Sequence, residues 1–138
     1  MAKRKPKSIA KLADDAACIL QRIVRLKAAD DNGYARCVTC GKVERWQDLQ
    51  GGHFIRRVYT AHKCLEENIH PQCAYCNGFS QTSLIAYTKF MYDTYGASFV
   101  DRLMATKNDI TKYSRPEIMC VIEDLKSYET QVRGDKGL

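Results

Sequence analysis

Two cysteine pairs of the form C-x-x-C constrain this chain more than any other feature. Cys37 and Cys40 form the first pair, Cys73 and Cys76 form the second, and residues 41–72 separate them. A structural zinc ion takes four thiolates at about 2.3 Å, and each C-x-x-C turn presents two sulfurs to one side of the ion. A redox dithiol of the thioredoxin kind needs only one such pair. We therefore predict that these four cysteines hold a structural Zn²⁺.

Charge and hydropathy narrow the class of partner. The 138 residues suit one domain, and they carry a net charge of +6 with a pI near 9.0. This balance favours a polyanion such as nucleic acid, although solvated lysines produce it as well. No stretch is apolar enough for a bilayer, and no signal-peptide core follows the basic N-terminus, so we expect a cytoplasmic protein without a membrane partner. Reduced thiols in that compartment favour a metal over disulfides.

The periodicity of apolar residues predicts a small, mostly helical α+β domain. A helix with Ser8 as its N-cap is expected over residues 8–29. Extended, hairpin-like chain follows from residue 43, and residues 68–73 form a second short strand. Beyond Cys76 we predict a helix ending at Gly96, a short helix over residues 97–105, and a final helix that opens with a capping box of Ser114 and Glu117.

The same pattern gives a prediction for the domain organisation. Residues 8–132 are expected to form one domain between a basic tail and a flexible C-terminus. The parts are a tail at 1–7, a lead-in helix at 8–29, a zinc-bound core at 34–95, C-terminal helices at 97–132 and flexible residues at 133–138.

Four polar residues within and after the zinc loop carry the candidate chemistry: His53, Asn68, His70 and Asn77. Hydrolysis of a phosphodiester needs a base that activates water and a divalent cation that holds the phosphate. Histidine suits the base because its pKa lies near neutrality, and asparagine offers a neutral oxygen to a hard cation. Cationic side chains suited to phosphate are found just after His53 and in the tail; they are Arg56, Arg57, Lys3, Arg4 and Lys5.

The order of these residues resembles the HNH, or ββα-metal, nucleases. "GHFIRR" followed by "NIHPQCAYCN" and "YTKFMYDTYG" is similar, more specifically, to the NinG (Rap) recombination nucleases of lambdoid phages. The resemblance covers roughly residues 20–105. It implies a zinc-stabilised ββα-metal motif in a phage- or prophage-encoded protein of a bacterial host. It also implies that His53 is the general base, that Asn68 holds the loop through backbone hydrogen bonds, and that Asn77 binds the catalytic Mg²⁺ or Mn²⁺.

One position departs from the HNH pattern. Many HNH nucleases place an acidic residue or a histidine directly before the base, where it binds the metal, whereas this chain has Gly52. We name His70 as the candidate second ligand. A phosphate contact or a structural hydrogen bond is the competing interpretation of His70.

The sequence therefore predicts a metal-dependent, structure-selective DNA endonuclease of phage recombination that acts on branched DNA. One alternative is a non-catalytic, zinc-dependent DNA-binding or adaptor protein, which the glycine at position 52 supports. Another is an HNH nuclease of phage DNA packaging. Because a DNA junction has two-fold symmetry, we also predict a homodimer, with the apolar faces of the first and last helices as its interface.

Overall fold

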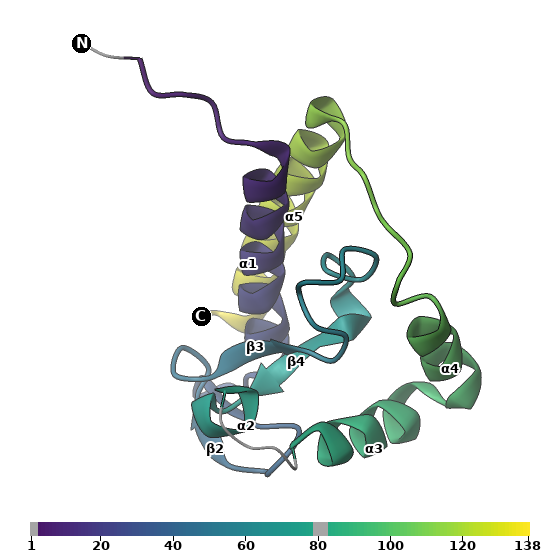
Figure 1. Cartoon of the computed structure of the whole chain (residues 1–138). Helices are drawn as coiled ribbons and strands as arrows, with labels where there is room; N and C mark the ends of the chain where they lie inside the picture. The colour runs from purple at the N-terminus through teal and green to yellow at the C-terminus, as the bar shows by residue number, and fades with distance from the viewer. Residues whose placement is uncertain (1–2, 79–82) are drawn as a thin grey trace.

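The computed structural model describes residues 3–78 and 83–138, and it confirms the α+β class with helices predominating (Figure 1). The helices are α1 (Ile9–Ala28), α2 (Ala74–Gly78), α3 (Ser83–Tyr95), α4 (Ala97–Ala105) and α5 (Arg115–Lys136). The strands are β1 (Tyr34–Arg36), β2 (Val43–Arg45), β3 (Gln50–His53) and β4 (Ile69–Gln72), and a 3₁₀ turn, η1 (Glu66–Asn68), precedes β4.

The first and last helices begin at the predicted caps. The Ser8 hydroxyl accepts a hydrogen bond from the Lys11 amide at 3.1 Å, and Ser114 and Glu117 form the complete capping box. Each cap satisfies amide groups that have no partner inside the first turn. These helix starts were therefore set by local sequence and are confirmed.

Helices α1 and α5 run side by side in the same direction (Figure 1). The Arg22 guanidinium pairs with both carboxylate oxygens of Glu129, at 2.9 and 3.1 Å. At the far end, the Lys136 ammonium donates to the Ala29 carbonyl at 2.7 Å, just beyond the end of α1. A parallel pair needs a long connection, and the remainder of the domain supplies it.

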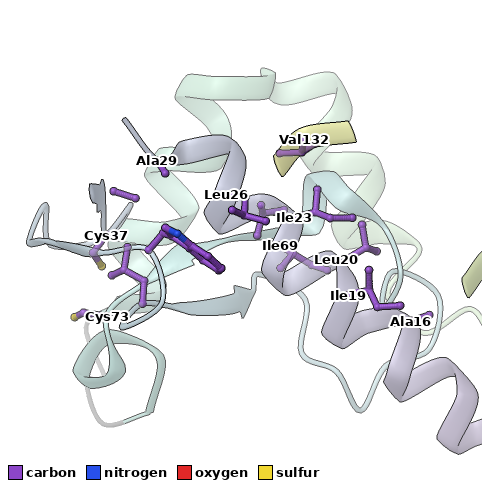
Figure 2. Close-up of a cluster of buried hydrophobic side chains, with 14 of the residues drawn as sticks. Ala16, Ile19, Leu20, Ile23, Leu26, Ala29, Cys37, Ile69, Cys73 and Val132 are labelled. Carbon is purple, nitrogen blue, oxygen red and sulfur yellow. The ribbon is translucent and has the colours of Figure 1, made fainter. Parts of the chain in front are cut away.

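The core lies along α1. Figure 2 shows the apolar row of this helix, from Ala16 to Leu26, lying near Ile69 of β4 and Val132 of α5. Ile118 and Ile122 of α5 are buried in the same cluster. The apolar faces of the first and last helices thus pack within one chain. This packing uses apolar surface that the predicted dimer interface needs, and the homodimer itself stays a prediction.

Two antiparallel hairpins position the site. β1 pairs with β2, and β3 pairs with β4 in a register that runs from Gln50 opposite Gln72 to His53 opposite Ile69. The second predicted strand is confirmed as β4. The extended chain from residue 43 is divided between two sheets, because β2 pairs back to β1 while β3 pairs forward to β4.

A second apolar cluster fixes the chain just after β3. Phe54 and Ile55 are buried against Tyr87 and Met91 of α3 and against Leu103 of α4. This packing anchors the loop that follows β3 to a part of the chain far away in sequence.

The C-terminus differs from the prediction. α5 continues to Lys136 instead of ending at residue 132, and Gly137 closes it with a φ of 66°. Leu138 packs against the main core. The hydrogen bond from Lys136 to α1 and this packing hold residues that we had expected to be flexible.

Candidate zinc cluster and basic groove

The four cysteines meet at one point. The sulfurs of Cys37, Cys40, Cys73 and Cys76 all lie within 4.8 Å of one another, and the sulfurs of Cys40 and Cys73 are 3.7 Å apart. Four thiolates around a tetrahedral zinc ion at about 2.3 Å would be spaced by about 3.8 Å. The donor set and the spacing fit zinc, so this cluster could hold the predicted ion.

Tight turns in the backbone orient the four cysteine sulfurs toward one another. Cys37 directly follows β1, and Gly41 after the first pair has a φ of 80°, a conformation that favours glycine. The Gly41 amide donates to the Cys37 carbonyl at 2.9 Å. Cys73 directly follows β4, and its carbonyl accepts from the Asn77 amide at 3.0 Å. The cluster therefore joins the ends of both hairpins to α2.

The β3–β4 register divides the candidate residues between two faces. Residues paired across an antiparallel ladder share a face, and neighbours along a strand alternate. His53 pairs with Ile69, which faces α1, whereas Gly52 pairs with His70 on the opposite face. His53 and His70 therefore project from different sides of one hairpin.

His53 is half-buried and held through one ring nitrogen. Its Nε2 lies 2.9 Å from the carbonyl oxygen of Lys63, and a carbonyl can only accept, so Nε2 carries the proton. Nδ1 then has the free lone pair. Burial lowers the pKa of His53 to about 4, so the ring is neutral at neutral pH. A neutral ring in this tautomer can accept a proton at Nδ1.

Asn68 is completely buried and binds the loop that leads from β3 to β4. Its side-chain oxygen accepts from the Ile55 amide at 2.8 Å, and its nitrogen donates to the carbonyls of Ile55 and His62, both at 3.0 Å. The loop between these residues carries Lys63, whose carbonyl holds His53. Asn68 thus acts on His53 through the backbone, and its part in catalysis stays a prediction.

An open groove of about 710 Å³ brings together four of the predicted site residues. His53, Asn77, Arg56 and Arg57 all line it. Further lining residues come from α1, from the β2–β3 connection and from the start of β3; they include Gln21, Arg25, Gln47, Asp48 and Gln50. Three arginines against one carboxylate make the groove basic.

Arg25 was not predicted from the sequence, yet it is the best-held cation of the groove. Its guanidinium donates to the carbonyls of Gln21 and Leu49, each at 2.9 Å, and lies 5.7 Å from the ring centre of Trp46. Only the packing of α1 against β3 brings it there. The only hint in the sequence is that Arg25 lies four residues after Gln21, which places both side chains on one face of α1.

Other predicted cations are placed differently. Arg57 lies 3.7 Å from a carboxylate oxygen of Asp14, which also pairs with Lys63, so part of its charge is balanced by α1. Lys3, Arg4 and Lys5 are exposed, precede α1 and do not line the groove. Figure 1 shows this segment leaving α1 at the end away from β3 and β4.

His70 does not belong to the groove, and this corrects its assignment as a second metal ligand. The Tyr87 hydroxyl donates to the Gly52 carbonyl at 2.7 Å, so its oxygen accepts from His70 Nδ1 at 3.1 Å. The Tyr95 hydroxyl lies 2.8 Å from Nε2 and donates to it. Burial lowers the pKa of His70 to about 4. Both nitrogens are engaged, so His70 supports the backbone of β3 from behind, in line with the competing interpretation as a structural hydrogen bond.

Comparison with known proteins finds one family that matches almost the whole chain. The profile of a family described as Bacteriophage Lambda NinG protein matches residues 1–134. The chain belongs to the NinG family. No curated protein and no solved structure matches it. Within the described part of this NinG-family chain, no helix combines the length and the apolar character that a membrane span requires.

Proposed function

We propose that this NinG-family chain is a metal-dependent DNA endonuclease of the HNH type, with His53 as the general base. One observation carries the proposal: a neutral histidine with a fixed tautomer lines a groove that also holds Arg25, Arg56 and Arg57. A protein that only binds DNA needs the cations but has no need of a base among them. Branched DNA is the proposed substrate because of the resemblance to recombination nucleases.

The arginines would bind the phosphates on either side of the scissile bond. Their guanidinium groups form paired hydrogen bonds with phosphate oxygens. An anionic phosphate beside His53 would also raise the pKa of the imidazole, since an opposite charge favours the protonated ring. Substrate binding would in this way make His53 a stronger base.

The chemical step is an in-line displacement at phosphorus. A water molecule attacks, its proton passes to Nδ1 of His53, and the bond from phosphorus to the 3′ oxygen breaks. The 3′ oxygen takes a proton from solvent and leaves as a hydroxyl, so that the other product keeps a 5′ phosphate. The hydrogen bond from Nε2 to the Lys63 carbonyl holds the ring as it becomes charged. General-base catalysis of this kind contributes on the order of 10²–10⁴-fold in rate.

A divalent cation, when bound, would stabilise charge on the phosphate and on the leaving oxygen. Asn77 is the residue that we propose to hold it. Its nitrogen donates to Gln50 at 2.8 Å, which leaves its oxygen free for a cation. Hard cations such as Mg²⁺ and Mn²⁺ prefer oxygen ligands of this kind.

Cleavage of a four-way junction and of a linear duplex, with Mg²⁺ or Mn²⁺, tests the function. We expect junction cleavage by the parent and a loss of about 10²-fold or more in His53→Ala, with zinc content and DNA affinity kept. His62→Ala is the matched control, because His62 lies in the same loop but its ring bonds to Thr106, directly after α4. Equal cleavage by His53→Ala and the parent would overturn the assignment of the base.

The non-catalytic DNA-binding alternative has one observation in its favour, since Gly52 supplies no carboxylate to a cation. It predicts junction binding without cleavage in either metal. Faster cleavage of linear duplex than of junctions would favour the DNA-packaging alternative instead.

A further inference from the structure

Two side-chain oxygens converge beside Gly52. A β-carbon added at residue 52 would lie 1.7 Å from Oε1 of Gln72 and 3.0 Å from Oδ1 of Asn77. Gln72 reaches this point from β4, and Asn77 reaches it from α2. Any side chain at residue 52 would need the space that the Gln72 amide occupies. The glycine is therefore explained by the oxygens that crowd it.

The orientation of Asn77 is fixed. Its Nδ2 donates to Gln50 Oε1 at 2.8 Å, and its backbone amide donates to the Cys73 carbonyl at 3.0 Å. With its nitrogen engaged on that side, Oδ1 faces Gly52. Asn77 also lines the basic groove, so this oxygen stands at the boundary between the groove and the far face of the hairpin.

The Gln72 side chain, unlike that of Asn77, makes no hydrogen bond within the described residues. Its residue is only 3% exposed, and among the described residues its side-chain amide has no hydrogen-bond partner. Its polar atoms are not completely sealed, because no fully buried side-chain atom in the described chain lacks a partner. A small ligand could therefore reach and satisfy it.

Both oxygens border Gly52, and within the described residues neither accepts a hydrogen bond, so together they can attract a cation. We infer that Gln72 Oε1 and Asn77 Oδ1 together bind the divalent cation, with Gln72 in the role that the missing side chain at residue 52 cannot fill. This inference rests on the proposed nuclease function for the role of the ion, but the binding itself does not require cleavage. Neutral amide oxygens suit Mg²⁺ or Mn²⁺, whose remaining positions would be filled by water and phosphate.

The zinc cluster would set the distance between these two ligands. Gln72 directly precedes Cys73, and Asn77 directly follows Cys76. Ordering the four thiolates around zinc fixes both neighbouring residues. Loss of zinc should therefore abolish binding of the second cation, even though the two ions share no ligand.

Binding of Mn²⁺ to the zinc-loaded protein, followed by electron paramagnetic resonance without DNA, tests the inference. Gln72→Glu places a charged oxygen at the same position and should tighten Mn²⁺ binding by at least about tenfold, while the apolar Gln72→Met should weaken it by a similar factor. Gln131→Glu makes the same chemical change on the exposed side of α5 and should leave the affinity unchanged. Tighter binding by Gln72→Glu cannot result from misfolding, and zinc content checks the fold of Gln72→Met.

The outcomes separate this inference from the proposed function. If Gln72→Met binds Mn²⁺ as tightly as the parent, or the parent binds none at millimolar Mn²⁺, the inference is overturned, whether or not the parent cuts DNA. An unchanged affinity in Gln72→Met would indicate that the Gln72 amide is turned over and donates to Asn77. If the mutants shift Mn²⁺ affinity as expected but the parent cuts no DNA, the result supports the cation site and refutes the proposed nuclease function.

Discussion

Gly51 is the point at which β3 meets α1, and its substitution tests that contact directly. A β-carbon at residue 51 would lie 2.6 Å from both Cβ and Cγ of Gln21 and 2.8 Å from its Cα. The last of these atoms belongs to the backbone of α1. Rotation of the Gln21 side chain cannot relieve that contact, so Gly51→Ala must push β3 and α1 apart.

Two effects of opposite sign decide the magnitude. Alanine is favoured over glycine inside a strand by about 0.5–1 kcal/mol, because the unfolded glycine has more freedom to lose. Overpacking at a rigid contact costs about 1–3 kcal/mol. α1 is held by its packing against α5, so we expect the clash to dominate and the free energy of unfolding to fall by about 1–2 kcal/mol.

Gly134 provides the matched control. It lies within α5, and a β-carbon there would meet nothing within 4 Å. Alanine is the better helix former by about 0.8–1 kcal/mol, so Gly134→Ala should raise the stability by up to that amount. The same substitution thus has opposite signs at two positions.

Urea denaturation at saturating zinc, followed by circular dichroism, measures both changes. A Gly51→Ala protein as stable as the parent would refute the close approach of β3 to α1. It would also remove the structural basis of the groove, because α1 contributes Gln21 and Arg25 to one side of it.

Three further predictions concern the metal, the histidines and DNA. Cys73→Ser should lose zinc and most of its folded structure, since metal binding and folding are coupled; a folded, zinc-loaded mutant would contradict the cluster. The pKa values of His53 and His70 are lowered to about 4, so the unfolded chain binds more protons between about pH 6.5 and 4. Stability from these rings is complete above pH 6.5 and falls as the pH drops through that window, and nuclear magnetic resonance should find both rings neutral near pH 5.5. DNA affinity should fall steeply with salt, because bound phosphates release counterions, and Arg56→Ala should make the salt dependence shallower by about one unit of slope.

Much of the candidate site could be predicted because it depends on short motifs and on the order of residues along the chain. Each C-x-x-C pair makes its own turn, and His53 and Asn77 stand at fixed offsets from the cysteines. Their roles as base and metal ligand stay predictions, but their meeting in one groove is a finding of the structure. The prediction of His70 as a metal ligand was wrong because its distance in sequence from the cysteines does not indicate which face of the β3–β4 hairpin its side chain is on. The β3–β4 register decides that face, and a shift of one residue would reverse it.

The sequence by itself determined the helix starts at Ser8 and Ser114, the strand before Cys73 and the two C-x-x-C turns that could hold zinc, since each depends on neighbours within a few residues. Only the tertiary structure decided that α1 and α5 pack in parallel, that Arg25 enters the groove, and that Gln72 fills the space beside Gly52. These contacts join residues far apart in the chain. They form because burying the apolar row of α1 against β4 and α5 is worth more than any local preference, and no local pattern records which elements will share that burial.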